Sequence, residues 1–443
     1  MSDASRSVAS VEYDDAPLRP FHAAVAVASS GGVFSDGYGL GIIGISLSLA
    51  APRLGLSPVW MGLLGGASLF GLFAGALLTG PAADRFGRRP LFAYNMVVLA
   101  LLSLLQYTVN SGAELLALRL AIGFFLGTDY VVSKALLTEF APRRFRGRIL
   151  GLLSVAWASG YACAYFVGFA LSASGPNAWR WMLITSAVPC LSILPLRVII
   201  PESPLWLTNH GHPGIAAGIV RAKLGAGVAP PAATLVARAI EGTWQQLLSP
   251  RWRLRTLVGC AFFTCQVIPY FAVGTFIPQV MSAMNLHSGY LGGLIYNLAL
   301  LVGAIGGLMV VDRLTRRTFL IGSFSIAAAT MLILILWNNV PAMAMSILFA
   351  IFAGVLSAAS NLVYVYLPEL FPTDLRASGI GLAIAASRIG SAVSTFLLPI
   401  VVAAYGVRMA LGTCVAVLAI GAVICQRWAP ETKNVRLGTR PDE

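Results

Sequence analysis

The sequence predicts an all-α integral membrane protein with twelve transmembrane helices in two six-helix bundles. Hydrophobic residues make up 58% of the 443 residues and charged residues only 11%. A soluble protein of this length needs more charges to cover its surface. Twelve apolar stretches are each long enough to cross a bilayer core of about 30 Å. Loop motifs also recur at a near-constant spacing, which indicates that a six-helix unit has been duplicated.

The apolar stretches follow one another closely, except for one long loop in the middle of the chain. Only helices and closed barrels satisfy every backbone polar group in lipid, and stretches of this length favour helices. The predicted spans are 21–50, 58–80, 90–109, 114–138, 149–174, 180–200, 256–281, 289–311, 318–337, 342–368, 377–404 and 407–428. The chain therefore divides into an N-terminal tail (1–20), a first bundle (21–200), a partly helical connector (201–255), a second bundle (256–428) and a C-terminal tail (429–443).

The basic residues fall almost entirely on one side of the predicted membrane. Of 30 Lys and Arg residues, 24 lie in the tails and loops of that side, including seven within 197–255. Only Arg53, Arg180 and Arg408 lie in loops of the other side. The positive-inside rule then predicts that both termini are cytoplasmic. The net charge of +13 does not indicate nucleic-acid binding, because no soluble basic domain is present.

Residue types that build catalytic or metal sites are few and dispersed. The six cysteines lie in apolar segments without a CxxC pair, and the four histidines lie in loops or at span ends. His210 and His212 are too few ligands for a metal site. No HExxH or GxSxG motif occurs. We therefore expect no enzyme activity, no cofactor, no metal and no disulfide framework.

Three loop motifs of the first half recur in the second half. Asp84–Arg89 recurs at Asp312–Arg317, Glu139–Arg146 at Glu369–Arg376, and Pro201–Ser203 at Pro430–Thr432. The offsets are 228, 230 and 229 residues, so all three motifs report one duplication. Two like-oriented halves of this kind are typical of transporters that rock around a central site.

These loops resemble those of the major facilitator superfamily. Gly80-Pro-Ala-Ala-Asp84-Arg85-Phe-Gly87-Arg88-Arg89 resembles its loop motif, and Pro201-Glu-Ser-Pro-Leu-Trp206 and Pro430-Glu-Thr-Lys433 resemble its sugar-porter branch. The resemblance runs from about residue 21 to residue 433. It implies the major facilitator fold and transport by alternating access.

Shorter motifs narrow the resemblance. Asp36-Gly37-Tyr38 resembles a motif of aromatic-acid and metabolite proton symporters, and Gly127-Thr128-Asp129-Tyr130 resembles a segment of phosphate:proton symporters. Glu369–Arg376 and Ser387-Arg388-Ile-Gly390 resemble sugar, organic-ion and vesicle-type members. The whole pattern is most similar to bacterial metabolite transporters with poorly defined substrates. The seventh span lacks the paired glutamines of well-known sugar porters, which argues against a hexose, and 149–174 lacks the prolines of drug antiporters.

Ionisable residues inside the spans are costly in lipid and indicate function. Asp129 and Asp36 are the carboxylates deep in the spans, and we expect Asp129 to be the main proton carrier and Asp36 the second candidate. Arg119 resembles a fourth-span motif linked to proton transfer, or pairs with an outer acid such as Glu114. Lys134 is expected to extend to the cytoplasmic surface, with a place in the cavity as the alternative. Arg388 is expected to neutralise Asp36 or Asp129, to bind an anionic substrate group, or to do both in turn.

Polar and aromatic side chains near mid-span complete the expected substrate cavity. With Asp36, Asp129 and Arg388, the candidates are Tyr38, Tyr130, Trp157, Tyr161, Gln266, Tyr270, Asn297, Asn361 and Tyr364. The resemblance further implies that charged loop residues hold an inner gate, with Glu139 acting with Arg146 and Glu369 with Arg376. These candidates are Asp84, Arg85, Arg88, Glu139, Arg146, Asp312, Arg313, Glu369 and Arg376.

We expect a secondary transporter of a small polar metabolite, such as a sugar, polyol or organic acid, in the bacterial inner membrane. Its partners would be the substrate, protons and the bilayer, with no nucleic acid, and the protein would be a monomer. Proton symport is the leading hypothesis, and facilitated diffusion or proton antiport are the alternatives. A channel is disfavoured by the duplicated halves and buried charges.

Overall fold

The computed structural model describes residues 11–232, 243–284, 289–311, 313–371 and 373–432, and these residues are almost entirely helical. The first half contains α1 (Pro20–Leu54), α2 (Pro58–Phe86), α3 (Arg88–Leu105), α4 (Gly112–Phe140), α5 (Arg146–Leu171), α6 (Ala178–Ile184) and α7 (Ala187–Ile199). The connector forms α8 (Pro204–Asn209), α9 (Pro213–Lys223) and α10 (Thr243–Leu247). The second half contains α11 (Arg253–Thr275), α12 (Ile277–Ala283), α13 (Gly289–Val310), α14 (Arg316–Leu336), α15 (Ala342–Ala359), α16 (Leu362–Leu370), α17 (Thr373–Tyr405) and α18 (Val407–Trp428). The helices of the described residues include twelve candidate membrane spans, as predicted.

Three spans that the sequence predicts as single helices are broken in the structure. The span at 180–200 divides into α6 and α7, and that at 256–281 into α11 and α12. Proline accounts for both breaks, since it lacks an N–H and its ring clashes with the carbonyl four residues earlier. Pro189 therefore interrupts the helix at Thr185, and Pro278 lies in the first turn of α12. The third break, between α15 and α16 at Ser360 and Asn361, has no proline at the break itself.

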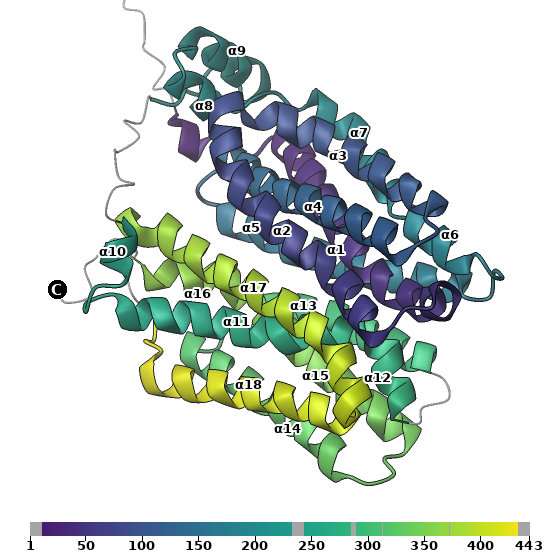
Figure 1. Cartoon of the computed structure of the whole chain (residues 1–443). Helices are drawn as coiled ribbons and strands as arrows, with labels where there is room; N and C mark the ends of the chain where they lie inside the picture. The colour runs from purple at the N-terminus through teal and green to yellow at the C-terminus, as the bar shows by residue number, and fades with distance from the viewer. Residues whose placement is uncertain (1–10, 233–242, 285–288, 312, 372, 433–443) are drawn as a thin grey trace, which may run out of the picture.

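The two halves form two groups of helices that lie side by side (Figure 1). They meet where α2 packs on α17, α5 on α13 and α1 on α11. The groups diverge toward the end that carries α8, α9 and α10. At the opposite end, a Cβ added at Gly44 would lie 1.9 Å from the Thr275 carbonyl oxygen, and one at Gly62 2.1 Å from that of Phe396. Glycine at these two positions lets the backbones of the two halves touch.

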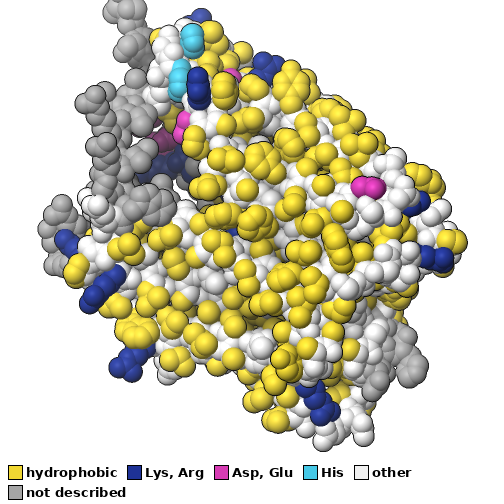
Figure 2. Space-filling view, viewed as in Figure 1, with side chains coloured by type: hydrophobic (Ala, Val, Ile, Leu, Met, Phe, Trp, Pro, Cys, Tyr) yellow, Lys and Arg dark blue, Asp and Glu magenta, His cyan; other side chains and the backbone are white. Residues whose placement is uncertain are grey.

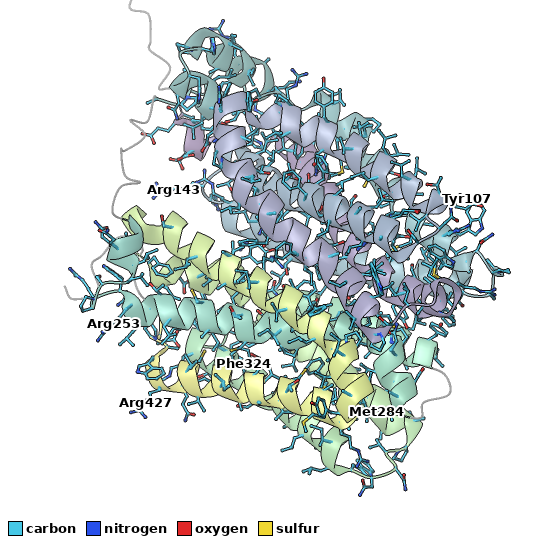
Figure 3. All side chains as sticks on the ribbon, in the orientation of Figure 1. Tyr107, Arg143, Arg253, Met284, Phe324 and Arg427 are labelled. Carbon is cyan, nitrogen blue, oxygen red and sulfur yellow. The ribbon has the colours of Figure 1, made fainter. Side chains whose placement is uncertain are left out.

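The outer surface fits a bilayer. On the face shown in Figure 2, hydrophobic side chains cover the middle of both helix groups, and Lys and Arg gather mainly at the rims. Leu77, Val302 and Ile420 are more than half exposed, which is favourable only in lipid. Figure 3 places Arg143, Arg253 and Arg427 at the divergent end and Tyr107 and Met284 at the other. The sequence assigns these three arginines to one side of the membrane, and the structure places them at one end of the molecule.

The N-terminal tail is tied to the divergent end by backbone and side-chain contacts. The Val11 N–H donates to the Gly227 carbonyl at 2.9 Å, and the Ala229 N–H donates to the Val11 carbonyl at 2.9 Å. The Asp14 carboxylate accepts a hydrogen bond from Arg146 at 2.9 Å. The tail therefore joins the start of α5 to the connector.

Candidate functional site

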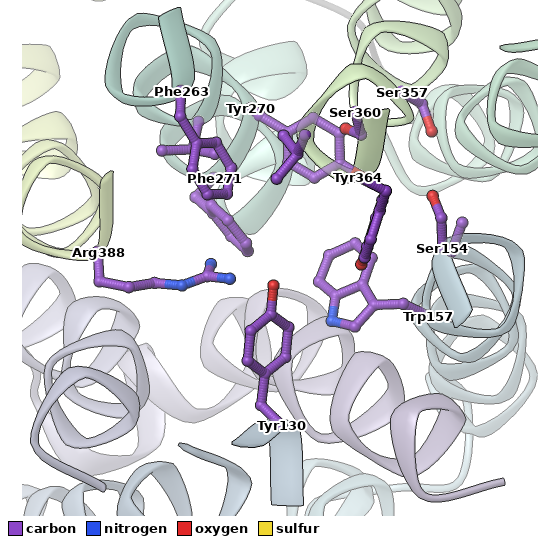
Figure 4. A pocket seen from close by; sticks show the side chains of 13 residues that line it. Tyr130, Ser154, Trp157, Phe263, Tyr270, Phe271, Ser357, Ser360, Tyr364 and Arg388 are labelled. Carbon is purple, nitrogen blue, oxygen red and sulfur yellow. The ribbon is translucent and has the colours of Figure 1, made fainter. Parts of the chain in front are cut away.

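A cavity lies between the two halves near the middle of the molecule. We call it the central cavity, and Figure 4 shows its lining from both halves. Its walls come from α4 and α5 of the first half and from α11, α15, α16 and α17 of the second. The lining residues are Tyr130, Ser154, Trp157, Ala158, Phe263, Val267, Tyr270, Phe271, Ser357, Ser360, Val363, Tyr364 and Arg388. Of the predicted substrate residues, the structure therefore brings together Tyr130, Trp157, Tyr270, Tyr364 and Arg388.

Arg388 provides a positive charge in the central cavity. Its side chain extends from α17 toward the hydroxyl of Tyr130 (Figure 4). The guanidinium carbon lies 5.2 Å from the centre of the Tyr130 ring and 5.9 Å from those of Phe263 and Phe271. Aromatic faces attract a cation but do not neutralise it. Among the described residues Arg388 has no ion pair, and its Nε is buried without a hydrogen-bond acceptor.

Lys134 provides a second charge beside the same cavity, so the expectation that it reaches the cytoplasmic surface is wrong. Its Nζ lies 3.4 Å from the centre of the Tyr130 ring and 4.8 Å from that of Tyr364. The 230-residue offset of the repeat makes Tyr364 the counterpart of Lys134. Equivalent positions of the two halves therefore meet here, which places the cavity on the pseudo-twofold axis.

Asp129 is held in an ion pair that the sequence did not predict. Its partner is Arg197 near the end of α7, which the charge count had placed on the cytoplasmic side. Both side chains are fully buried. Arg197 Nη1 donates to Asp129 Oδ1, and Nη2 donates to Oδ2 at 3.0 Å and to the Ser133 hydroxyl at 2.9 Å. Arg388 is therefore not the partner of Asp129.

The remaining donors of Arg197 are also used. Its Nε donates to the Ala28 carbonyl and its Nη1 to the Phe92 carbonyl, each at 3.1 Å. A planar guanidinium with all five N–H groups satisfied is the arrangement that makes a buried ion pair tolerable. Gly32 makes room for it, since a Cβ there would lie 1.5 Å from Arg197 Nη2.

Asp36 is the unpaired carboxylate of this region. It lies in α1, it is 1% exposed, and neither of its oxygens accepts a hydrogen bond from a described residue. The charges that act on it are those of Asp129, Arg197, Lys134 and Arg388. Asp36 therefore stands in electrostatic range of both the buried ion pair and the two cations of the central cavity.

Arg119 is fully buried in α4, and its Nη2 donates to the Gly39 carbonyl at 2.9 Å. Its Nε and Nη1 have no acceptor among the described residues. Glu114, the partner considered from the sequence, instead accepts from the Asn110 N–H and the Ser111 hydroxyl, both at 2.9 Å. The Arg119–Glu114 pair is therefore not formed.

Several predicted cavity residues lie outside the lining. The amide nitrogens of Gln266, Asn297 and Asn361 donate to backbone carbonyls of Leu356, Gly293 and Ala304. Tyr38 donates to the Thr185 hydroxyl at 2.8 Å, and the Tyr161 ring stacks behind Trp157 at 5.2 Å. The structure thus places these side chains in the walls around the central cavity.

Charged loop residues of the first half form one cluster at the divergent end. Arg88 pairs with Asp84 at 2.9 Å and with Glu139 at 3.3 Å. Glu202 accepts from the backbone N–H groups of Arg88 and Arg89, each at 3.0 Å. Glu202 therefore caps the N-terminus of α3, where the helix dipole favours a negative charge.

The second half repeats this cluster at the positions that the duplication predicts. Arg316 pairs with Glu369 at 3.4 Å, and Glu431 accepts from the backbone N–H groups of Arg316 and Arg317, each at 3.0 Å. Glu202 and Glu431 were missed as site residues, although the Pro-Glu-Ser and Pro-Glu-Thr motifs that contain them were recognised. Each cluster lies within its own half of the molecule. Its contacts therefore stabilise that half and do not join the two halves.

Some predicted gate contacts differ or lie outside the described residues. Glu139 pairs with Arg88, and Arg146 pairs with Asp14 at 2.9 Å, so this structure, in which the halves diverge at that end, does not contain the expected contact of Glu139 with Arg146. Arg85 is exposed beside Phe86, and Arg313 lies in the turn before α14. Asp312 and the side chain of Arg376 are outside the described part of the chain.

Comparison with known proteins identifies the family. The chain matches the model described as "Sugar (and other) transporter" over residues 23–440. It belongs to this family. It is 39% identical over 430 residues to the inner membrane metabolite transport protein YgcS of Escherichia coli strain K12, covering 96% of this chain and 95% of that protein.

The fold is shared with solved transporter structures. The partially occluded inward-open xylose transporter XylE from E. coli matches with a TM-score of 0.80 at 20% identity, over 95% of this chain and all of that one. A D-xylose-proton symporter matches with a TM-score of 0.76 at 19% identity, over 93% and 98%. The chain is thus a multi-pass metabolite transporter of the bacterial inner membrane with the major facilitator fold. Its relatives and structural neighbours are transporters and not enzymes.

Proposed function

We propose that this transporter moves a small organic metabolite through the central cavity by alternating access, together with a proton that binds at Asp36. The observation that carries the proposal is a buried carboxylate in α1 without a hydrogen-bond partner among the described residues. An ionised carboxylate in such a place is costly, and a proton removes the cost. Water that reaches the site in another state of the cycle would restore the charged form and release the proton.

This proposal reverses the order in which the sequence ranked the two carboxylates. Asp129 was expected to be the main carrier, but it is engaged with both Nη atoms of Arg197. Both carboxylate oxygens of Asp129 thus already accept from a guanidinium, whereas those of Asp36 accept no hydrogen bond from a described residue. Asp129 and Arg197 support the proposal as a fixed pair beside Asp36, on which both act electrostatically.

The proposal also includes the topology and the outer partners. Both termini face the cytoplasm, since the basic residues gather at the divergent end, and the protein works as a monomer in the bilayer. The divergent end opens to the cytoplasm.

The test is proton-coupled uptake into proteoliposomes, followed for D-xylose, D-gluconate and benzoate as probes. We expect one probe class to accumulate when the outside is acidic and to stop accumulating when an uncoupler is added. Asp36→Asn should abolish accumulation while exchange of labelled for unlabelled probe persists, because exchange needs only the loaded carrier. Asp15→Asn is the matched control, since it changes an exposed carboxylate of the N-terminal tail. If Asp36→Asn still accumulates the probe against its gradient, the proton site is elsewhere; uncoupler-resistant accumulation would point to another coupling ion.

A further inference from the structure

We propose that the substrate of this transporter is a small aromatic monocarboxylate, bound with its carboxylate between Arg388 and Lys134 and its ring against the aromatic wall of the central cavity. The inference rests on the proposed function in one respect, namely that the central cavity is the transport site. It is carried by two independent features of the cavity, its charge and its lining.

The charge comes from one cation of each half. Lys134 belongs to α4, and Arg388 belongs to α17. Both face the Tyr130 ring, with Lys134 Nζ 3.4 Å and the Arg388 guanidinium carbon 5.2 Å from its centre. Neither side chain forms an ion pair with a carboxylate among the described residues. A group placed near the Tyr130 hydroxyl would therefore contact both halves at once, which a transported substrate must do.

The ionisable groups around the cavity carry an excess of positive charge. Arg197 is neutralised by Asp129, which leaves Lys134 and Arg388 as the two cations whose charges act on Asp36. With a proton on Asp36, both cations lack a counterion. Unpaired buried charges are costly, and a substrate carboxylate would relieve this cost directly. A guanidinium also binds carboxylate through two parallel hydrogen bonds, and the free Nε of Arg388 is available for one of them.

The lining favours an aromatic ring over a sugar. Trp157 stacks on Tyr161 at 5.2 Å, and the Phe271 ring meets Trp157 edge-on at 5.8 Å. Together with Tyr270 and Phe263 these rings form flat apolar walls. A polyhydroxylated ligand needs a polar partner for most of its hydroxyls, and such partners are usually amide side chains or carboxylates. The lining contains no amide or carboxylate side chain, and its hydroxyls are those of Ser154, Ser357, Ser360 and three tyrosines. The nearby amide of Gln266 lies in the wall, where its nitrogen donates to the Leu356 carbonyl and to the Ser360 hydroxyl.

The proposal is tested by equilibrium binding to the purified full-length protein in lipid nanodiscs, with tryptophan fluorescence and thermal shift as readouts. The probes are benzoate, its neutral isostere benzamide, the non-aromatic cyclohexanecarboxylate, and D-xylose. We expect benzoate to bind at least about tenfold more tightly than benzamide and cyclohexanecarboxylate, a difference of about 1.4 kcal/mol. D-xylose should not compete with benzoate.

Variants locate the site. Arg388→Lys keeps the charge and loses the planar fork, so benzoate affinity should fall about tenfold or more. Lys134→Met should weaken benzoate binding more than it weakens any benzamide binding. Arg253→Lys is the matched control, since Arg253 is an exposed arginine at the start of α11. Comparing probes on the unaltered protein needs no variant, so a variant that fails to fold does not affect the main test.

The outcomes separate this inference from the proposed function. Benzoate and benzamide binding with equal affinity, or D-xylose displacing benzoate, would overturn the inference, whether or not transport is proton-coupled. Equal affinity for cyclohexanecarboxylate would overturn its aromatic part. Benzoate could bind more tightly than benzamide while its uptake does not depend on the proton gradient. That result would support the inference and contradict symport. Binding at equilibrium needs no gradient, so the two failures are distinguishable.

Discussion

At the scale of single residues, the buried pair of Asp129 and Arg197 dominates the first half. Each of the five guanidinium N–H groups has an acceptor, and two of the hydrogen bonds go to the carboxylate. The pair joins α4 to α7, and α1 passes it at Gly32 without a side chain in between. Such an arrangement stabilises a protein only while both partners are present.

Removing one partner should therefore cost more than removing both. We expect Asp129→Asn to destabilise the protein by about 3–5 kcal/mol, because it leaves Arg197 charged and buried. Arg197→Gln should have a similar effect, and the double variant should recover a large part of the loss. Thermal unfolding of the four proteins in one detergent gives the double-mutant cycle. If the Asp129→Asn variant unfolds at the same temperature as the original protein, the pair has no structural role.

At the scale of elements, two glutamates cap corresponding helices of the two halves. Glu202 follows α7 and caps α3, while Glu431 follows α18 and caps α14. Each carboxylate accepts two backbone N–H groups at 3.0 Å. The last helix of each half is thereby tied to its third span.

We expect Glu202→Gln and Glu431→Gln each to lower stability, by about 1.5–3 kcal/mol, since each change weakens charge-assisted hydrogen bonds to a helix N-terminus. Glu12→Gln, in the exposed tail, is the control. Limited proteolysis should detect the change in the affected half first. If both variants resist proteolysis as well as the original protein does, the two glutamate caps do not stabilise the halves.

At the scale of the whole molecule, the charges around the central cavity set the electrical character of transport. One proton on Asp36 and one monocarboxylate between Lys134 and Arg388 add no net charge to the moving protein. We therefore expect benzoate uptake at a fixed pH gradient to be unaffected by a potassium diffusion potential imposed with valinomycin. The measurement compares initial rates in proteoliposomes at zero and at about −100 mV, where each transferred charge would be worth about 2.3 kcal/mol. A rate that rises with a negative interior would show that more than one proton accompanies each anion.

The sequence was sufficient for the fold because twelve apolar spans, one long connector and three repeated loop motifs all report it directly. It also located Arg388, Tyr130, Trp157, Tyr270 and Tyr364 in the cavity, since depth within a span and polarity are visible in a single chain. The sequence could not predict which charged residues form ion pairs, because the register and rotation of one helix against another depend on packing. Arg197 lies near a span end and resembled a topogenic arginine, yet the missing side chain at Gly32 lets it reach Asp129.

The Glu202 cap has a consequence for the way the protein is made. All of its partners precede Glu202 or lie close to it in the chain, so the first half can close into a braced unit before the ribosome has reached α11. Domains of a nascent chain generally fold in that order. The second half would then be inserted beside a folded first half, whose surface around Gly62 is the one that packs on α17. Each half also holds its own closing glutamate, so a gene cut within the connector should yield two fragments that assemble when produced together in one cell.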